Sequence, residues 1–236
     1  MTLSSDPLEP RGPVWEFKGK TVHDFDTHIR QSIPLYEESC QLIGQLSDFF
    51  VKTDSLIYDI GCSLGTLTHQ LASRHAQHPQ AQWVGIDHEA DMISYAKTHN
   101  AHPNITYITD DVCTYPFEPC DLVIAHYSLQ FIHPKHRQNV INHLYQSLHW
   151  GGAFIFFEKV RGPDARFQDI ATTLYQEYKL HKGFSASDIL AKTTRLKGVL
   201  EPFSTQGNID LLKRAGFQDI TTFMKYICFE GFLAIK

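Results

Sequence analysis

The sequence lacks a long hydrophobic run and a long basic run. A membrane-spanning helix needs about 20 mostly apolar residues, and no segment approaches that length, nor does a signal peptide open the chain. The formal net charge is −5, which disfavours broad electrostatic binding to phosphates. We therefore expect neither a membrane nor an extensive nucleic-acid footprint as a partner.

Paired cysteines are also missing. The five cysteines are scattered, odd in number and without a Cys-x-x-Cys pair. This pattern disfavours a disulfide framework and favours reduced thiols in a cytoplasmic protein. His133 and His136 stand three apart near a predicted helix start, but no clear third ligand accompanies them. We interpret them as surface histidines and predict no metal site.

The stretch from Ser55 to Thr68 organises the rest of the chain. It begins as an apolar strand, turns at glycines and continues as a helix from about Thr66. A continuous apolar run bounded by glycines fits the first strand of a parallel sheet that is covered on both faces. Its Asp-x-Gly-x-x-x-Gly pattern differs from the dinucleotide fingerprint. It is the related loop of Rossmann-like sheets that bind S-adenosylmethionine (SAM).

Each residue type in this loop has a physical role. Gly61 and Gly65 lack a Cβ, so the backbone can bend sharply and a ligand can approach it closely. Backbone N–H groups at the helix start could bind the methionyl carboxylate. Asp59 could take the ammonium group, directly or through water. An ordinary tight strand-to-helix turn is the alternative interpretation.

Acidic residues end the next two predicted strands. Asp87 closes residues 81–87 and is placed to hold the two ribose hydroxyls, or to cap the helix that follows. Asp111 closes the strand that begins at Ile105 and could accept a hydrogen bond from the adenine amino group, or remain a solvated loop acid. The order and spacing of these acids and the glycine loop predict a SAM-binding domain.

The remaining segments complete an α/β pattern. Residues 1–23 contain Pro7, Pro10 and Pro13 and read as a flexible tail. Residues 24–236 form a single domain, with a helical lid at 24–51 and a helical insertion at 160–205 over the substrate site. Gly151-Gly152 is interpreted as a turn into strand five, and Phe229-Glu230 as the turn of a terminal hairpin. Alternating strands and helices predict a doubly wound, mostly parallel sheet with this antiparallel hairpin at its end.

Aromatic residues mark the first half of the insertion. Tyr175 and Tyr178 could contribute to a substrate wall. Phe167, Ile170 and Leu174 recur with Tyr178 at helical spacing, which core packing explains equally well.

Several segments resemble a known family, the carboxy-S-adenosylmethionine synthases, bacterial enzymes of wobble-uridine modification in tRNA with the class I methyltransferase fold. The similar segments are residues 29–36 (Ile-Arg-Gln-Ser-Ile-Pro-x-Tyr), 58–65, 128–131, 151–153 with Glu158-Lys159, and the Leu-x-x-Ala-Gly-Phe run ending at Phe217. The resemblance covers about residues 24–235. It implies a homodimer that uses the insertion.

The resemblance also implies a set of cofactor-binding residues. They are Tyr36 as a ligand contact, Gly61, Cys62 and Ser63 at the methionyl part, Asp87 at the ribose, Asp111 and Val112 at the adenine, and His126 on the sulfonium side, where the family has asparagine. His88 is a further cofactor-binding candidate beside Asp87. Histidine titrates near neutrality, so His126 is also the candidate general base. It could equally be a structural or cofactor-lining residue.

One position departs from the family pattern. The family holds the extra carboxylate of carboxy-SAM with an arginine in a Lys-Arg-Ser context, and Thr193 stands in that place here. Threonine supplies neither the charge nor the two parallel hydrogen bonds of a guanidinium. Arg195 lies two residues on, about 200° around a helix.

We therefore expect a SAM-dependent methyltransferase that acts on an unidentified small-molecule acceptor and releases S-adenosylhomocysteine. The first alternative is a carboxy-SAM synthase that uses SAM and prephenate. The second is a SAM-binding protein without enzymatic activity.

Overall fold

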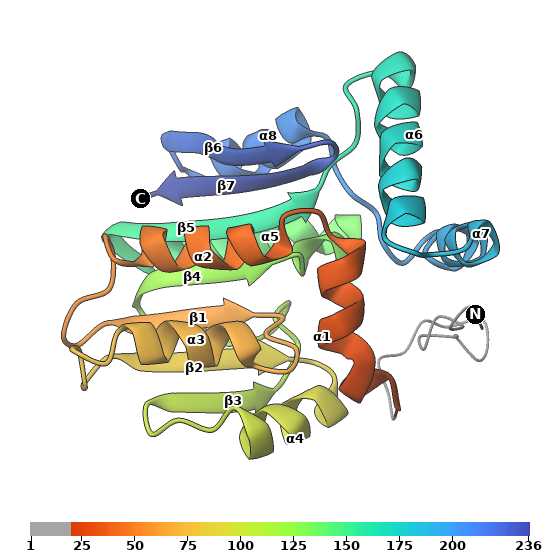
Figure 1. The fold of residues 1–236 in the computed structure, drawn as a ribbon. Helices are drawn as coiled ribbons and strands as arrows, with labels where there is room; N and C mark the ends of the chain where they lie inside the picture. The colour runs from red at the N-terminus through yellow and green to blue at the C-terminus, as the bar shows by residue number, and fades with distance from the viewer. Residues whose placement is uncertain (1–19) are drawn as a thin grey trace.

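This computed structural model describes residues 20–236, with side chains described from Phe25 onward. These residues include a seven-stranded sheet. The strand order is β3-β2-β1-β4-β5-β7-β6 (Figure 1). The strands are β1 Leu56–Ile60, β2 Gln82–Asp87, β3 Ile105–Thr109, β4 Cys120–His126, β5 Leu148–Lys159, β6 Asp219–Tyr226 and β7 Phe229–Ile235. The first five strands are parallel, and β7 is antiparallel to both β5 and β6. The predicted doubly wound sheet with a terminal hairpin is confirmed.

Helices cover both faces of the sheet and its carboxyl end. They are α1 Lys20–Ser32, α2 Tyr36–Ser47, α3 Thr66–Arg74, α4 Ala90–His99, α5 Pro134–Ser147, α6 Ala165–His181, α7 Ala186–Arg195 and α8 Thr205–Ala215, with a 3-10 turn at Leu129–Phe131. Helices α2, α3 and α4 pack on one face, and α5 and α8 on the other. Figure 1 shows α1, α6 and α7 beyond the ends at which the parallel strands finish.

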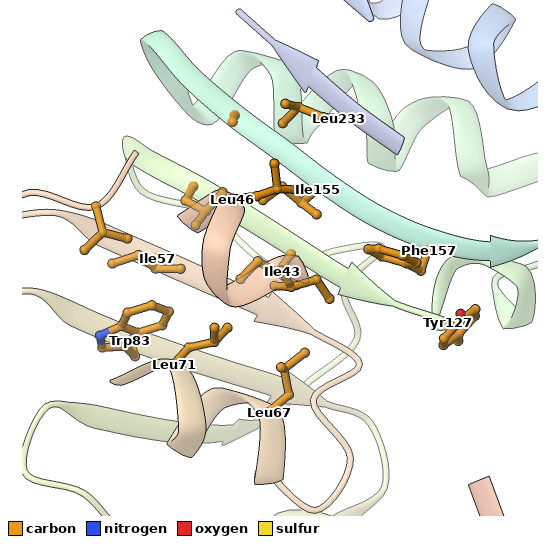
Figure 2. Packing of buried hydrophobic residues seen from close by; sticks show 14 of the residues in the cluster. Ile43, Leu46, Ile57, Leu67, Leu71, Trp83, Tyr127, Ile155, Phe157 and Leu233 are labelled. Carbon is orange, nitrogen blue, oxygen red and sulfur yellow. The ribbon is translucent and has the colours of Figure 1, made fainter. Parts of the chain in front are cut away.

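Strand β5 shows how the sequence fills both layers. Ile155 and Phe157 belong to the cluster with α2 and α3, whereas Phe154 and Phe156 belong to the cluster with α5 and α8. Figure 2 shows the first cluster around Ile43. Alternate side chains point to opposite faces, so an uninterrupted apolar run requires a strand that is covered on both sides. Burial of each large apolar side chain stabilises the fold by about 1.5–3 kcal/mol.

Two predicted turns are wrong. Gly151 and Gly152 lie inside β5, where the pairing with β4 shifts register and Gly151 has φ 78°. The glycine pair therefore forms an irregularity within the strand instead of a turn before it. The hairpin turns at Ile227 and Cys228, and Glu230 is fully buried within β7.

The N-terminal helices start earlier than predicted. Residues 1–19 of the predicted tail lie outside the described residues, and α1 already begins at Lys20.

The two ends of the insertion, residues 160–205, lie next to each other. Arg161 N donates to Phe203 O at 2.9 Å, and Arg161 forms an isolated bridge with Ser204. Helices α6 and α7 thus leave the sheet and return at one point.

Candidate cofactor and acceptor site

The glycine loop after β1 is built by close backbone packing. Gly61 and Gly65 have φ of 71° and 72°, a region that favours glycine. A Cβ on Gly61 would lie 2.3 Å from Ser128 Cβ, and one on Gly65 would lie 2.5 Å from Tyr107 Oη. No described side chain caps the N-terminus of α3, which begins at Thr66, so its first N–H groups suit a carboxylate.

Asp59 is a buried residue of β1, just before this loop. Its Oδ2 accepts a 2.6 Å hydrogen bond from Thr68 Oγ1. The pKa of Asp59 is raised to about 6, chiefly by burial and to a smaller extent by the charge of Asp87, while the Thr68 hydrogen bond opposes the shift. A buried carboxyl poised near neutrality gains from a cationic ligand group, because the opposite charge favours its ionised form.

Asp87 does not cap α4, whose N-cap residue is Glu89 and has no side-chain capping bond, but two backbone N–H groups hold its carboxylate. Its Oδ2 accepts from Ser63 N at 2.9 Å, and its Oδ1 accepts from Glu89 N at 3.0 Å. These bonds fix the carboxylate at the end of β2, and each oxygen keeps a further lone pair for a ribose hydroxyl. His88 follows with a side chain that is 72% exposed, and its Nδ1 lies 3.6 Å from Asp87 Oδ1.

Asp111 and Val112 lie in the loop after β3, which ends at Thr109, so Asp111 does not close the strand itself. Asp111 Oδ1 accepts from Cys113 N at 2.9 Å, and Asp110 Oδ1 accepts from Asp111 N at 2.7 Å. These short-range bonds shape a loop whose residues line the same cavity as the glycine loop.

A neutral histidine lies at the end of β4. His126 Nε2 is 2.8 Å from Ser39 Oγ, and the Ser39 hydroxyl donates to Tyr36 O at 2.7 Å. Since the hydroxyl proton is committed to Tyr36 O, we assign the imidazole hydrogen to Nε2 and leave Nδ1 as an acceptor. Burial lowers the pKa of His126 to about 3, so the ring is uncharged near pH 7. The Tyr36 ring lies 4.9 Å from it, centroid to centroid.

One cavity of about 1120 Å³ brings these residues together. Of the predicted cofactor residues, ten line it: Tyr36, Asp59, Gly61, Cys62, Ser63, Asp87, His88, Asp111, Val112 and His126. Gly65 does not line the cavity; it packs against Tyr107 and starts α3. Helices α1, α6 and α7 also contribute to the walls, so the cavity extends from the glycine loop to the insertion.

The insertion places Thr193 in the cavity wall. Thr193 Oγ1 donates to Ile189 O at 2.7 Å within α7. Arg195 does not line the cavity and is exposed. Lys192 does line it and contacts His28 of α1.

Sequence reasoning missed two lysines in the cavity. Lys159 ends β5 and Lys179 lies on α6, with ammonium nitrogens 4.6 and 4.5 Å from the ring centroid of Tyr175. Lys179 is only 7% exposed. Glu158, the residue before Lys159, is buried and does not line the cavity. Charged residues on a helix are normally exposed, so only the docking of α6 reveals Lys179.

Within residues 25–236, no group of three histidine, cysteine or acidic side chains could hold a metal ion. None of the helices described there is both long and apolar enough to cross a membrane.

The sheet order, the glycine loop and the acids at the strand ends define a class I SAM-dependent methyltransferase fold. Residues 57–152 match a family model described as a methyltransferase domain. The fold is similar to phosphoethanolamine N-methyltransferase 2 of Haemonchus contortus, solved in complex with SAM, with TM-score 0.65, 17% identity, and coverage of 92% of this chain and 56% of that one. An O-methyltransferase-like structure from Nostoc punctiforme gives TM-score 0.64, 16% identity, and coverage of 91% and 60%. The protein is a SAM-dependent transferase.

Curated relatives identify the family. The chain is 33% identical over 223 residues to a carboxy-S-adenosyl-L-methionine synthase of Staphylococcus epidermidis, covering 94% of this chain and 97% of the relative. A synthase of the same description from Campylobacter jejuni is 33% identical over 224 residues, with 94% of each chain covered. The chain belongs to the carboxy-S-adenosyl-L-methionine synthase family.

Proposed function

We propose that this protein transfers the methyl group of SAM to a small-molecule acceptor and releases S-adenosylhomocysteine. The observation that carries the proposal is Thr193. At the position where the family resemblance implies a carboxylate-binding arginine, α7 presents a hydroxyl that already donates to Ile189 O. The nearby Arg195 is outside the cavity wall.

The cofactor end of the cavity suits a ligand with a carboxylate, an ammonium group and a ribose. In the proposed mode, the start of α3 binds the carboxylate, Asp59 binds the ammonium group, and Asp87 binds the ribose hydroxyls. Asp111 and Val112 border the adenine, while Cys62, Ser63 and His88 complete the walls. SAM supplies a methyl group on a sulfonium centre.

His126 and Tyr36 are proposed to border that centre. A neutral imidazole can lie beside a sulfonium cation without the repulsion that an imidazolium would cause. A pKa of about 3 makes His126 a weak base at neutral pH, which favours a lining role over proton abstraction. The protein then contributes mainly by aligning acceptor, methyl and sulfur and by excluding water.

Carboxy-SAM synthesis from SAM and prephenate is the second candidate. It is favoured by the near full-length similarity to the curated synthases and by the lysine ammonium groups in the cavity. This candidate requires one of those cations to replace the missing arginine at the sulfonium carboxylate.

Mass spectrometry of the nucleoside bound after incubation with SAM, with and without prephenate, tests both candidates. A prephenate-dependent species heavier than SAM by the mass of carbon dioxide would establish the synthase and contradict methyl transfer. SAM or S-adenosylhomocysteine alone supports methyl transfer. An Asp87→Ala variant, expected to lose the nucleoside, is the control. Absence of SAM binding by the natural protein would overturn both candidates.

We also infer a cytoplasmic homodimer without an extensive nucleic-acid footprint. All five cysteines are free thiols, as expected in a reducing compartment. Phe167, Ile170 and Leu174 of α6 are 54%, 50% and 45% exposed, so this apolar stripe does not pack in the core of one chain. It suits the dimer interface on the insertion that the family resemblance implies. Light scattering of the purified protein checks the dimer, and a single-chain mass would contradict it.

A further inference from the structure

Charge is divided between the two ends of the cavity. Acids come from α1, from the carboxyl ends of β1 and β2, and from the segments that follow β2 and β3. Cations come from the end of β5 and from the insertion. The lining acids of the first group are Asp26, Asp59, Asp87, Glu89, Asp110 and Asp111; the lining cations are Lys159, Arg161, Lys179, Lys192 and Lys197, with Glu201 as the acid among them. A cationic cofactor matches the acidic end, which leaves the basic end for a different, anionic molecule.

Lys159 and Lys179 have no anionic partner among the described side chains. The ion pairs of residues 25–236 do not include either ammonium group. The ionisable groups facing them are the Cys228 thiol and Arg161, besides each other. Burial raises the pKa of Cys228, so the thiol remains protonated and brings no negative charge.

Burial disfavours the charged form of both lysines. The pKa of Lys179 is lowered to about 8, first by burial and then by Lys159, and burial also lowers the pKa of Lys159. The ring of Tyr175 contacts both cations, but one ring stabilises an ammonium less than a hydrogen-bonded carboxylate does. An anion entering the cavity would satisfy both groups.

The surroundings of the pair are aromatic and lead back to the cofactor end. Ring centroids are 5.1 Å apart for Tyr175 and Phe229, 5.9 Å for Phe229 and Tyr127, and 4.6 Å for Tyr127 and His126. This row of rings offers an apolar surface between the lysines and His126. A molecule with an anionic end and a flat apolar body would fill it.

We propose that Lys159 and Lys179 form a carboxylate-binding subsite that selects an acidic acceptor with an aromatic or similarly flat body. The subsite rests on the proposed function, because it assumes that the acidic end of the cavity is occupied by the cofactor. It is separate from the α3 terminus, which takes the cofactor's own carboxylate. The two lysines determine specificity, and the methyl-transfer geometry is set elsewhere in the cavity.

Calorimetric titration of protein saturated with S-adenosylhomocysteine tests the subsite, with 3-phenylpropionate as the probe. Lys159→Gln and Lys179→Gln should each weaken probe binding at least tenfold, as expected for loss of a charged hydrogen-bond partner. Lys179→Arg should retain most of the affinity. Lys182→Gln is the matched control, because Lys182 lies on the Tyr178 ring at 5.5 Å and outside the cavity.

The outcomes separate this subsite from the proposed function. Failure of the natural protein to bind S-adenosylhomocysteine would contradict the cofactor assignment. Normal binding of S-adenosylhomocysteine with no probe binding, or with probe affinity indifferent to both lysine substitutions, would overturn the subsite alone. Equal affinity for the neutral 3-phenylpropanamide would also overturn it, and tighter binding of phenyl phosphate would reassign it to a phosphate. If Lys179→Gln fails to fold, as judged by circular dichroism, Lys159→Gln and Lys179→Arg decide.

Discussion

Thr68 Oγ1 donates a 2.6 Å hydrogen bond to Asp59 Oδ2 at the floor of the cavity. Helix α3 thus supplies both the hydroxyl that orients Asp59 and, at its N-terminus, the N–H groups above it. The bond favours the ionised carboxyl, while burial and Asp87 oppose ionisation and hold the pKa of Asp59 at about 6. The charge of this group therefore depends on pH near neutrality.

SAM affinity should consequently fall as pH decreases through 6. Below that pH the free protein carries a neutral Asp59, and a ligand ammonium must first displace the proton; the loss approaches about tenfold per pH unit. Asp59→Asn should bind SAM about 10- to 100-fold more weakly and lose this pH dependence, since a charged hydrogen bond contributes about 1.5–3 kcal/mol. Binding titrations from pH 5 to 8 measure both effects.

Thr68→Val provides the matched comparison for that titration. Without the hydroxyl donor, the pKa of Asp59 should rise further and the midpoint of the affinity profile should move to higher pH. A profile for Asp59→Asn that overlays the natural protein would contradict the assignment of Asp59 to the ammonium group.

Gly61→Ala should disrupt the loop by two separate effects. The substitution places a side chain at φ 71° and puts Cβ 2.3 Å from Ser128 Cβ. We expect destabilisation of about 1–3 kcal/mol together with loss of SAM binding, measured by thermal denaturation and calorimetry. Adding Ser128→Gly removes the collision but not the positive φ, so it should restore only part of the stability. Full recovery in the double variant would show that backbone strain at residue 61 is negligible.

The loop was predictable because its signals are local. The apolar run from Leu56 to Ile60 and the glycines behind it require a buried strand and a sharp turn. Parallel topology then brings the carboxyl ends of β1, β2 and β3 to one edge of the sheet, so Asp59, Asp87 and Asp111 converge without any further information.

Other features depend on tertiary contacts. The hairpin turns at Ile227, whose φ of 52° is unusual for a β-branched residue, so no turn-forming residue marks its position. Lys179 and the exposed Leu174 lie on one helix, and periodicity alone makes the leucine the buried residue. The docking of α6 against Phe229 and the end of β5 reverses that expectation.

Lys179→Met should stabilise the protein near neutral pH. The pKa of Lys179 is about 8 in the folded state against 10.5 for a solvated lysine, so folding disfavours the charged form. Below pH 8 this disfavours folding, and the effect disappears as pH rises from 8 to 10.5, where the unfolded lysine also loses its proton. Removing the charge should raise the free energy of unfolding at pH 7 by about 1–3 kcal/mol.

Chemical denaturation at pH 7 and pH 10 measures this difference, and Lys182→Met is the exposed control. The facing groups Lys159 and Cys228 titrate in the same alkaline range, so the comparison is between variants at each pH. A less stable Lys179→Met at pH 7 would mean that the ammonium has a favourable partner in the free protein. A Lys179→Met variant that is more stable but binds 3-phenylpropionate more weakly would show the trade-off expected of a binding residue.

Thr193→Arg should raise the affinity for carboxy-SAM relative to SAM. Thr193 lines the cavity, and a guanidinium there could form two parallel hydrogen bonds with the added carboxylate. We expect the ratio of the two affinities to shift about tenfold or more towards carboxy-SAM, measured by competition against bound S-adenosylhomocysteine. Thr194→Arg is the matched control, because Thr194 is the next residue of α7 and lies outside the cavity. If the natural protein already prefers carboxy-SAM and Thr193→Arg changes nothing, a lysine of the basic end holds the carboxylate, and synthase activity becomes the better assignment.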